Sequence, residues 1–435
     1  EYGENGALVP DLTLFFDVPA KTALERISGR GGKKEFFEER PKLERIAKSY
    51  RDAASFLQKK DQRRLVRIDA RKPLETVARE TEKAIGEFFA TRKQASRSSS
   101  QQKILIIKQT SLGDVLHSTA ALKILKREFP KSQITVITDK GSSGIFSSNP
   151  SVDKLILTDF AHWEKTWWKR PLATLREIRK SFRETRKERF DLAYDLQGLF
   201  RSVAFLYAAR AANKWVKGNW PFLGGFRSKH LHAVHEIRSV LEVSGVNTFA
   251  AGTELAISSK DRASADKILG RFRRRNRPVV LVSPFTRWPS KDWSTERFAG
   301  LIALLQKDFQ VLVTGSSADR EKSQSLLPAG HSPKTVLDLT GKLSLGEFGA
   351  VLEKSDLLIS GDSFPVHAAS ALQKPVVVLF GPTDERRVGP MGTSFRILRS
   401  PRCAICYNRT CPKRCLDDIH PNEVLRAAKE LLESK

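Results

Sequence analysis

The sequence predicts an α/β protein with two doubly wound, Rossmann-like domains that face a cleft and follow a shorter α/β segment. Short runs rich in Ile, Leu and Val alternate with amphipathic helical patterns along most of the 435 residues, which is typical of parallel sheets covered by helices. Residues 92–102 are polar, lack apolar periodicity and predict a flexible linker. The basic stretch Arg271-Phe-Arg-Arg-Arg-Asn-Arg277 then divides the chain into a domain at 103–270 and another at 271–435.

Residues 1–91 predict about half of a nucleotide-binding α/β domain. Apolar runs of strand type occupy 12–18 and 65–69. Helical patterns cover 20–27, 43–56 and 73–89. Because the chain starts at Glu1 and its single methionine is Met391, we expect it to come from a longer product.

The rest of the chain predicts two series of parallel strands with helices between them. The first has strands at 103–108, 133–138, 154–157 and 192–196, with helices from Asp114 and at 172–188. The second has strands at 278–282, 310–313, 357–359 and 376–380, with helices at 297–307, 345–353, 364–372 and 421–432. Two such domains indicate the GT-B architecture, in which ligands bind between the facing carboxyl ends of two sheets.

The formal charge of +27 indicates anionic partners. Basic residues occur in every segment and are not gathered into one arm with interleaved aromatics, so an anionic membrane or phosphate-rich substrate is favoured over nucleic acid. A basic surface without a single partner is the alternative. No apolar stretch is long enough to span a bilayer, and over 400 residues precede the first cysteine, which suits a reducing compartment.

A candidate catalytic carboxylate, Asp114, ends the turn Ser111-Leu-Gly-Asp114 between a predicted strand and its helix. It would lie at the carboxyl edge of the sheet, facing the cleft. The alternative is a helix N-cap, which spacing alone favours, because Asp commonly satisfies free backbone N–H groups there.

The segment 103–123, Lys-Ile-Leu-Ile-Ile-Lys-Gln-Thr-Ser-Leu-Gly-Asp-Val-Leu-His-Ser-Thr-Ala-Ala-Leu-Lys, resembles the opening of the heptosyltransferases, glycosyltransferase family 9. Further similar segments follow in the family's order up to the C-terminus, at 149–154, 194–199, 232–235, 287–293, 361–369 and 379–384. The resemblance implies inverting transfer of heptose from ADP-heptose to the lipopolysaccharide inner core, without a cofactor for catalysis. It implies that Asp114 is the general base and places Asp195 and Gln197 on the acceptor side.

Lys291 is the second candidate catalytic residue, and Thr286 and Arg287 precede it after the first strand of the second domain. Its ammonium would stabilise the charge that grows on the donor diphosphate as the glycosidic bond breaks. A surface turn anchored by Trp288 and Trp293 is the alternative, and we expect both tryptophans to be structural.

Asp362, Ser363 and Phe364 begin another helix, whose free N–H groups suit a sugar diphosphate. The resemblance implies that Asp362 contacts the donor sugar and that its neighbours approach the phosphates. Phe364 stands where the family usually has glycine, which favours altered donor binding. We expect His367 to be a packed helix residue.

All four cysteines, Cys403, Cys406, Cys411 and Cys415, lie within thirteen positions. Four thiolates in a short loop can surround Zn²⁺ tetrahedrally, so we expect a structural zinc without a catalytic role. Free thiols, two local disulfides or an iron–sulfur cluster are the alternatives.

The first ninety residues resemble the C-terminal half of thymidylate kinase, through Pro-Asp-Leu-Thr-Leu-Phe-Phe-Asp-Val-Pro, Ala-Leu-Glu-Arg-Ile and Arg-Leu-Val-Arg-Ile-Asp-Ala. The phosphate-binding G-x-x-x-x-G-K-[ST] loop is absent, so we expect this partial P-loop-kinase-like segment to be catalytically silent. A non-catalytic nucleotide-sugar-binding protein is a further alternative. The family resemblance and the charge together predict a cytoplasmic enzyme in peripheral contact with the inner membrane.

Overall fold

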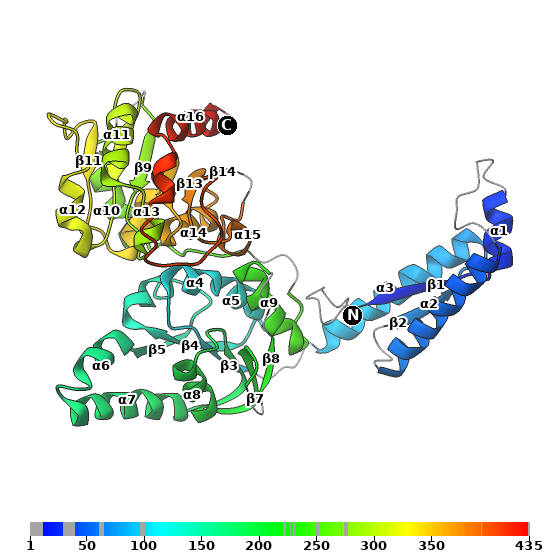
Figure 1. The fold of residues 1–435 in the computed structure, drawn as a ribbon. Coiled ribbons are helices and arrows are strands. Elements are labelled where there is room, and N and C mark those ends of the chain that lie inside the picture. The colour runs from blue at the N-terminus through cyan, green and yellow to red at the C-terminus, as the bar shows by residue number, and fades with distance from the viewer. Residues whose placement is uncertain are drawn as a thin grey trace. The chain divides into compact units, whose positions relative to one another are not determined.

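The computed structural model divides the chain into two compact units, residues 1–100 and 101–435 (Figure 1). It describes residues 12–28, 40–60, 65–95, 101–220, 223–226, 228, 231–248, 252–270, 272–273, 277–392 and 394–433. Among the helices in these ranges, none is both long enough and apolar enough to cross a bilayer.

The first unit has the predicted order of strand, two helices, strand and helix. Its elements are β1 (Thr13–Asp17), α1 (Ala20–Ser28), α2 (Arg40–Lys60), β2 (Leu65–Asp69) and α3 (Leu74–Ala95). The two strands pair in parallel, and Asp17 accepts a hydrogen bond from Arg51 at 2.9 Å and pairs with Arg67. α3 runs four residues into the stretch predicted as a linker, because Ala, Arg, Lys and Gln there are good helix formers.

The first half of the second unit is a six-stranded parallel sheet in the order β5-β4-β3-β6-β7-β8. Its strands are β3 (Lys103–Ile107), β4 (Gln133–Asp139), β5 (Lys154–Thr158), β6 (Arg189–Asp195), β7 (Arg210–Lys217) and β8 (Gly224–Phe226). Its helices are α4 (Leu112–His117), α5 (Thr119–Glu128), α6 (Phe160–Thr166), α7 (Pro171–Arg186), α8 (Phe200–Ala208) and α9 (Ala233–Val243).

The second half repeats this strand order, as β11-β10-β9-β12-β13-β14. Its strands are β9 (Val279–Ser283), β10 (Gln310–Val313), β11 (Val336–Asp338), β12 (Leu357–Gly361), β13 (Val376–Phe380) and β14 (Phe395–Arg399). Its helices are α10 (Ser259–Gly270), α11 (Thr295–Leu305), α12 (Arg320–Gln324), α13 (Leu345–Lys354), α14 (Phe364–Ala371), α15 (Glu385–Val388) and α16 (Pro421–Glu433). The helix α10, which the boundary predicted at 270 would leave in the first domain, packs against α13 of the second half. The predicted fold class, two doubly wound domains of the GT-B type, is therefore confirmed.

Several elements were missing from the sequence prediction, mainly at the edges of the sheets. The strand β7, next to the edge strand β8, reads Arg-Ala-Ala-Asn-Lys-Trp-Val-Lys, and only Val216 in it is buried, so it lacks a continuous apolar run. The helix predicted from Asp114 starts at Leu112 and is followed at once by a second helix from Thr119.

The strand β3 is buried on both faces and connects two cores. Ile104 and Ile106 belong to a core that continues into the second half, through Val115 and Leu281 among others. Leu105 and Ile107 belong to the core beneath α7 and α8, which Figure 1 shows on the side of the sheet away from the second half. The shared core fixes the turns that follow β3, β6, β9 and β12 relative to one another.

Candidate active site

The predicted site residues follow the central strands of the two sheets. In each sheet the strand order reverses between two neighbours, β3 and β6 in the first and β9 and β12 in the second. Ligands of open α/β sheets bind outside the carboxyl ends of strands at such switch points. The residues after these four strands are Asp114 after β3, Asp195 and Gln197 at the end of β6, Thr286, Arg287 and Lys291 after β9, and Asp362, Ser363 and Phe364 after β12.

Asp114 lies in the first turn of α4, but it is not the N-cap. The N-cap is Ser111, whose hydroxyl donates to Asp114 Oδ2 at 3.0 Å. The cap interpretation of Asp114 is therefore wrong, and its carboxylate is directed by Ser111 instead.

Positive charge keeps Asp114 ionised. Burial alone would raise the pKa of this carboxyl, but the charges of Lys108, His117 and Lys217 and the Ser111 bond outweigh burial and lower the pKa to about 2. Lys108 is only 2% exposed, and its ammonium donates to the Leu196 carbonyl at 3.3 Å. Lys108 is thus a fixed cation beneath the site that the sequence alone did not single out.

Asp195 stabilises the turn after β6, and its side chain is not accessible to an acceptor. Its carboxylate is fully buried and accepts bonds from the Gln197 and Gly198 amides and the Ser202 hydroxyl, at 2.8, 3.1 and 2.8 Å. Direct contact of the Asp195 carboxylate with an acceptor is therefore not supported, and a role through the turn stays a prediction. Gly198 has φ +70°, and a Cβ there would lie 1.8 Å from the Lys217 carbonyl oxygen, so the turn requires glycine.

Gln197 links the two switch-point turns of the first sheet. Its Oε1 accepts bonds from the amides of Gln109 and Thr110 at 3.3 and 3.1 Å. Arg201 adds a bond to the Thr110 hydroxyl at 2.6 Å. Gln197 is half-buried, and its contact with an acceptor stays a prediction.

Lys291 and Asp362 form a salt bridge on the donor side, with 2.6 Å between Nζ and Oδ2. Asp362 Oδ2 also accepts the Thr383 hydroxyl at 2.5 Å. The Lys291 ammonium lies 4.4 Å from the centroid of the Trp288 ring, which Arg409 also approaches, at 4.7 Å. The ammonium is therefore held from two sides at the edge where a diphosphate is expected.

Of the other residues after β9, Thr286 stabilises the turn and Arg287 lies at the surface. The Thr286 hydroxyl donates to Asp292 Oδ1 at 2.7 Å, which closes the turn. Arg287 is exposed and has no ion pair within the described parts of the chain. Trp293 is buried and donates through Nε1 to the Ile419 carbonyl at 3.2 Å, in agreement with its expected structural role.

Ser363 is the N-cap of α14, and Phe364 is its first residue. The Phe364 ring packs against Phe348, 5.8 Å between centroids, and joins the shared core. Only the backbone of Phe364 can face an anion, so its expected donor contact does not involve the ring. Pro365 follows, which removes one N–H donor from this helix end.

Two histidines join the halves beside Asp114. His117 Nε2 and His367 Nδ1 are 3.1 Å apart, and a Cβ on Gly113 would lie 2.5 Å from His367 Cδ2. Burial lowers the pKa of both imidazoles, and it lowers the pKa of the neighbouring His232 to about 4. His232 in turn contacts the Gly389 carbonyl of the second half at 3.2 Å. His367 is thus packed, as expected, but its partner comes from the other domain.

The four cysteines are reduced, and Cys406 is exposed. Burial and the neighbouring thiols of Cys415 and Cys406 raise the pKa of Cys403 to about 11. Within the described ranges, no three His, Cys, Asp or Glu side chains are arranged to hold a metal ion. The zinc site therefore stays a prediction.

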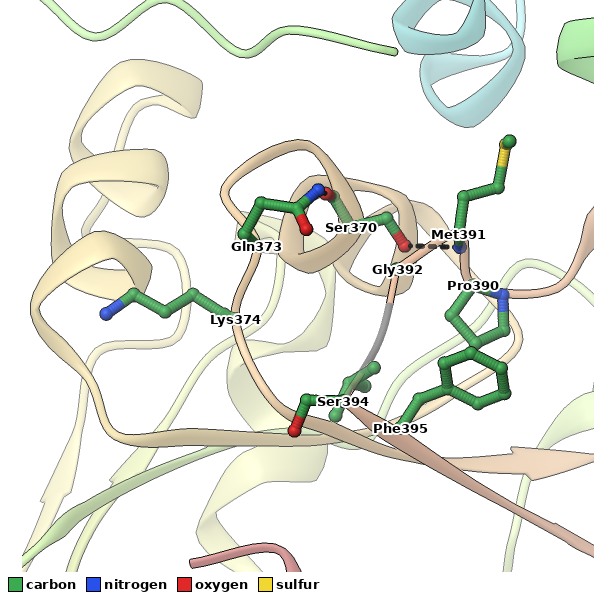
Figure 2. A pocket seen from close by; sticks show the side chains of 9 residues that line it. Ser370, Gln373, Lys374, Pro390, Met391, Gly392, Ser394 and Phe395 are labelled. Atoms are coloured by element: carbon green, nitrogen blue, oxygen red, sulfur yellow. Dashed lines mark hydrogen bonds between the residues drawn. The ribbon is translucent and has the colours of Figure 1, made fainter. Parts of the chain in front are cut away.

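A small pocket lies at the opposite end of α14 (Figure 2). Ser370 and Gln373 line it, and the Ser370 hydroxyl accepts the Met391 amide at 3.0 Å. It adjoins Val376, the first residue of β13, so it is at the amino edge of the sheet and away from the four site turns.

Comparison with known proteins shows that the chain resembles glycosyltransferases of one family. The model of glycosyltransferase family 9 (heptosyltransferase) matches residues 178–417. Lipopolysaccharide heptosyltransferase 1 of Escherichia coli K12 is 25% identical over 306 residues, covering 69% of this chain and 94% of the relative. The protein of the same description from Pseudomonas aeruginosa is 28% identical over 330 residues, covering 71% and 87%.

Two solved structures have the same fold. The glycosyltransferase family 9 protein from Veillonella parvula aligns with a TM-score of 0.67 at 23% identity, covering 77% of this chain and 98% of that one. The E. coli heptosyltransferase WaaC with ADP aligns with a TM-score of 0.61 at 22% identity, covering 76% and 99%.

Proposed function

Because this chain belongs to glycosyltransferase family 9, we propose that it is an inverting heptosyltransferase that transfers heptose from ADP-heptose to the inner core of lipopolysaccharide. The observation that carries the proposal is the placement of Asp114 and the Lys291–Asp362 pair after strands at the two switch points. Similarity to lipopolysaccharide heptosyltransferases along most of their length supports the sugar and the acceptor class.

In the proposed reaction, an acceptor hydroxyl attacks the anomeric carbon of the heptose in one displacement. The new bond joins the acceptor oxygen to this carbon, and the bond to the diphosphate breaks, so ADP leaves with the electron pair. Asp114 accepts the hydroxyl proton. With a pKa of about 2 it is ionised at neutral pH, and proton transfer comes late, once the attacking oxygen has become acidic.

On the donor side, Lys291 stabilises the charge that develops on the departing diphosphate. Its salt bridge to Asp362 and its position over Trp288 fix the ammonium before the donor arrives. A fixed cation needs little reorganisation during the reaction, so it favours the transition state. Arg287, which has no ion pair with a described residue, supplies a second cation at the same edge. Ser363 and the Phe364 N–H bind the diphosphate at the start of α14.

The acceptor is a glycolipid of an anionic membrane leaflet, so the enzyme works in peripheral contact with the cytoplasmic face of the inner membrane and binds no nucleic acid. The charge of +27 favours such a contact. No cofactor takes part in catalysis in this proposal.

A non-catalytic nucleotide-sugar-binding protein is the alternative, since Phe364 replaces the usual glycine. Packing of the Phe364 ring against Phe348 favours the enzyme, because it holds the ring in the core and not over the donor turn. For residues 1–91 we propose a partial thymidylate-kinase-like segment without catalysis of its own. The alternative is part of a thymidylate kinase that is inactive without its missing phosphate-binding loop.

Calorimetric titration with ADP-heptose, followed by a transfer assay on a heptose-less core acceptor, tests the proposal. We expect donor binding and turnover, with inverted configuration at the anomeric carbon. Binding without turnover favours the non-catalytic alternative, and the absence of both refutes the proposal.

A further inference from the structure

An exposed aromatic and basic surface lies on the first half of the second unit, at the corner between α6 and α7. Trp168 is 88% exposed, Leu172 73% and Trp167 40%. Figure 1 shows this corner at the end of the domain where α6 turns into α7. Large apolar side chains gathered at one exposed corner indicate a surface that is covered during function.

The outer face of α7 continues this corner as a row of cations. Its exposed residues recur every three or four positions, so they lie along one side of the helix, over a length of about 22 Å. Besides Pro171 and Glu177, the exposed residues of α7 and the position after it are Leu172, Arg176, Arg179, Lys180, Arg183, Arg186 and Lys187. The opposite face packs inward, where Phe182 stacks on Phe205 at 4.1 Å and Ser181 donates to the Leu157 carbonyl at 3.5 Å.

Most of these cations are unpaired. Residues 160–187 contain nine Lys or Arg and three Glu, a net charge of +6. Of the nine, only Lys187 has an ion pair with a described residue, to Glu184. Glu177 is engaged by the Trp163 indole at 3.1 Å and lies 3.8 Å from His162. The acidic side chains therefore do not neutralise the outer face of α7.

We propose that this surface, Trp167, Trp168, Leu172 and the exposed cations of 165–187, docks the enzyme onto an anionic lipid bilayer. Indole rings favour the interface between head groups and acyl chains, and Lys and Arg reach phosphate head groups beside them. The surface lies in the domain that carries Asp114, on the face of its sheet opposite α4, so docking there would hold this domain at the membrane that contains the acceptor. The biological role of the docking rests on the proposed function, but the lipid contact itself does not.

A second copy of this chain is a poor occupant of the same surface. Pairing two copies through it would bring two unpaired rows of cations together. An acidic protein or an RNA would satisfy the charge, but neither requires adjacent exposed indole and leucine side chains at the end of the row. The combination favours lipid.

Sedimentation of the full chain with vesicles tests the proposal by measuring the fraction of protein bound to lipid. Vesicles of phosphatidylglycerol and phosphatidylethanolamine should bind it, and vesicles of phosphatidylcholine should bind it much more weakly. The variant Arg176→Gln, Arg179→Gln, Lys180→Gln, Arg183→Gln should partition on the order of 100-fold less, because each cation near an anionic surface adds to binding. Trp168→Ser should lower binding several-fold and leave a remainder that high salt removes.

Matched control variants separate this surface from charge and exposure in general. The charge control removes four exposed cations of the second half that have no ion pair among the described residues, by Lys307→Gln, Lys322→Gln, Lys334→Gln and Arg426→Gln. This variant should bind vesicles nearly as well as the wild type. Leu74→Ala, at an apolar side chain 84% exposed, controls for Trp168. Equal loss in the controls and the surface variants would overturn the proposal.

Transfer assays keep this inference separate from the proposed function. The surface variants should act normally on a delipidated, water-soluble core acceptor and poorly on the same acceptor in vesicles. If no acceptor supports turnover, the proposed function fails while vesicle binding still decides this inference. Vesicle binding that is unchanged in the surface variants, with RNA binding or self-association lost instead, would overturn it.

Discussion

Lys291 and Asp362, 71 residues apart in the chain, meet at 2.6 Å because their turns follow the neighbouring strands β9 and β12. The Asp362 side chain is 3% exposed and that of Lys291 14%, so this is a mostly buried salt bridge at the edge of the site. A Cβ on Gly361 would lie 3.0 Å from Thr286 Cγ2, which shows how closely the two turns approach. The pair therefore connects donor binding with the stability of the second domain.

Replacing Lys291 with Ala should weaken ADP-heptose binding and slow transfer together, since the ammonium acts before and during bond cleavage. It also leaves Asp362 buried without its cation, which should destabilise the domain by ~3 kcal/mol. Calorimetry and urea unfolding measure the two effects. In the double variant Lys291→Met, Asp362→Asn, stability should return but donor affinity should not. Unchanged rate and affinity in Lys291→Ala would place the lysine outside the site.

Asp114→Asn should lower turnover by roughly two to four orders of magnitude, the usual effect of losing a general base, with little change in donor affinity. Since the pKa of Asp114 is about 2, its protonation should cause no loss of wild-type activity above about pH 4. Ser111→Ala, which removes the 3.0 Å bond, should have a much smaller effect. Steady-state kinetics measure these effects. Near wild-type turnover in Asp114→Asn would show that Asp114 is not the general base.

Acid should destabilise the second unit through its buried histidines. His232 protonates near its ordinary pKa of 6.5 when unfolded but only near 4 when folded. The contribution of neutral His232 to the free energy of unfolding is complete above pH 6.5, the pKa in the unfolded chain, and is lost as the pH falls toward 4. This one group should cost about 2 kcal/mol between pH 7.5 and 5. Urea unfolding at both pH values checks this, and His232→Gln should reduce the difference in stability between them.

Purified protein should hold about one zinc per chain, because four cysteine ligands saturate a tetrahedral site. Chelation should lower the thermal stability before it affects transfer, because the four cysteines lie between β14 and α16, and only Arg409 of their loop approaches Trp288 near the site. Elemental analysis measures the metal. Four titratable thiols without metal would exclude the zinc, and iron with acid-labile sulfide would replace it by a cluster.

Deletion of residues 1–95 should leave transferase activity nearly unchanged, because residues 101–435 form a compact unit of their own. The 435-residue chain should not phosphorylate thymidylate, since it has no loop to hold a triphosphate. A coupled ADP-release assay with thymidylate and ATP tests this. Kinase turnover from the purified chain would contradict it.

Much of the fold could be predicted from local pattern alone. The strands at 103–107 and 279–283 are continuous apolar runs because both faces of a central parallel strand are buried. The position of the turn residues after these strands could also be predicted, since the carboxyl ends of parallel strands lie at one edge of the sheet. Strands near the edge of a sheet, such as β7, could not be predicted, because partial exposure allows polar residues in them.

The sequence by itself determined the two doubly wound domains and the set of residues at their switch points, because periodicity records which side of each element is buried. Only the tertiary structure decided what those residues touch. His117 meets His367 across 250 positions, Asp195 is buried in its own turn, and the Phe364 ring joins the core. Such contacts depend on the distances between packed elements, which the shared core fixes and no local pattern encodes.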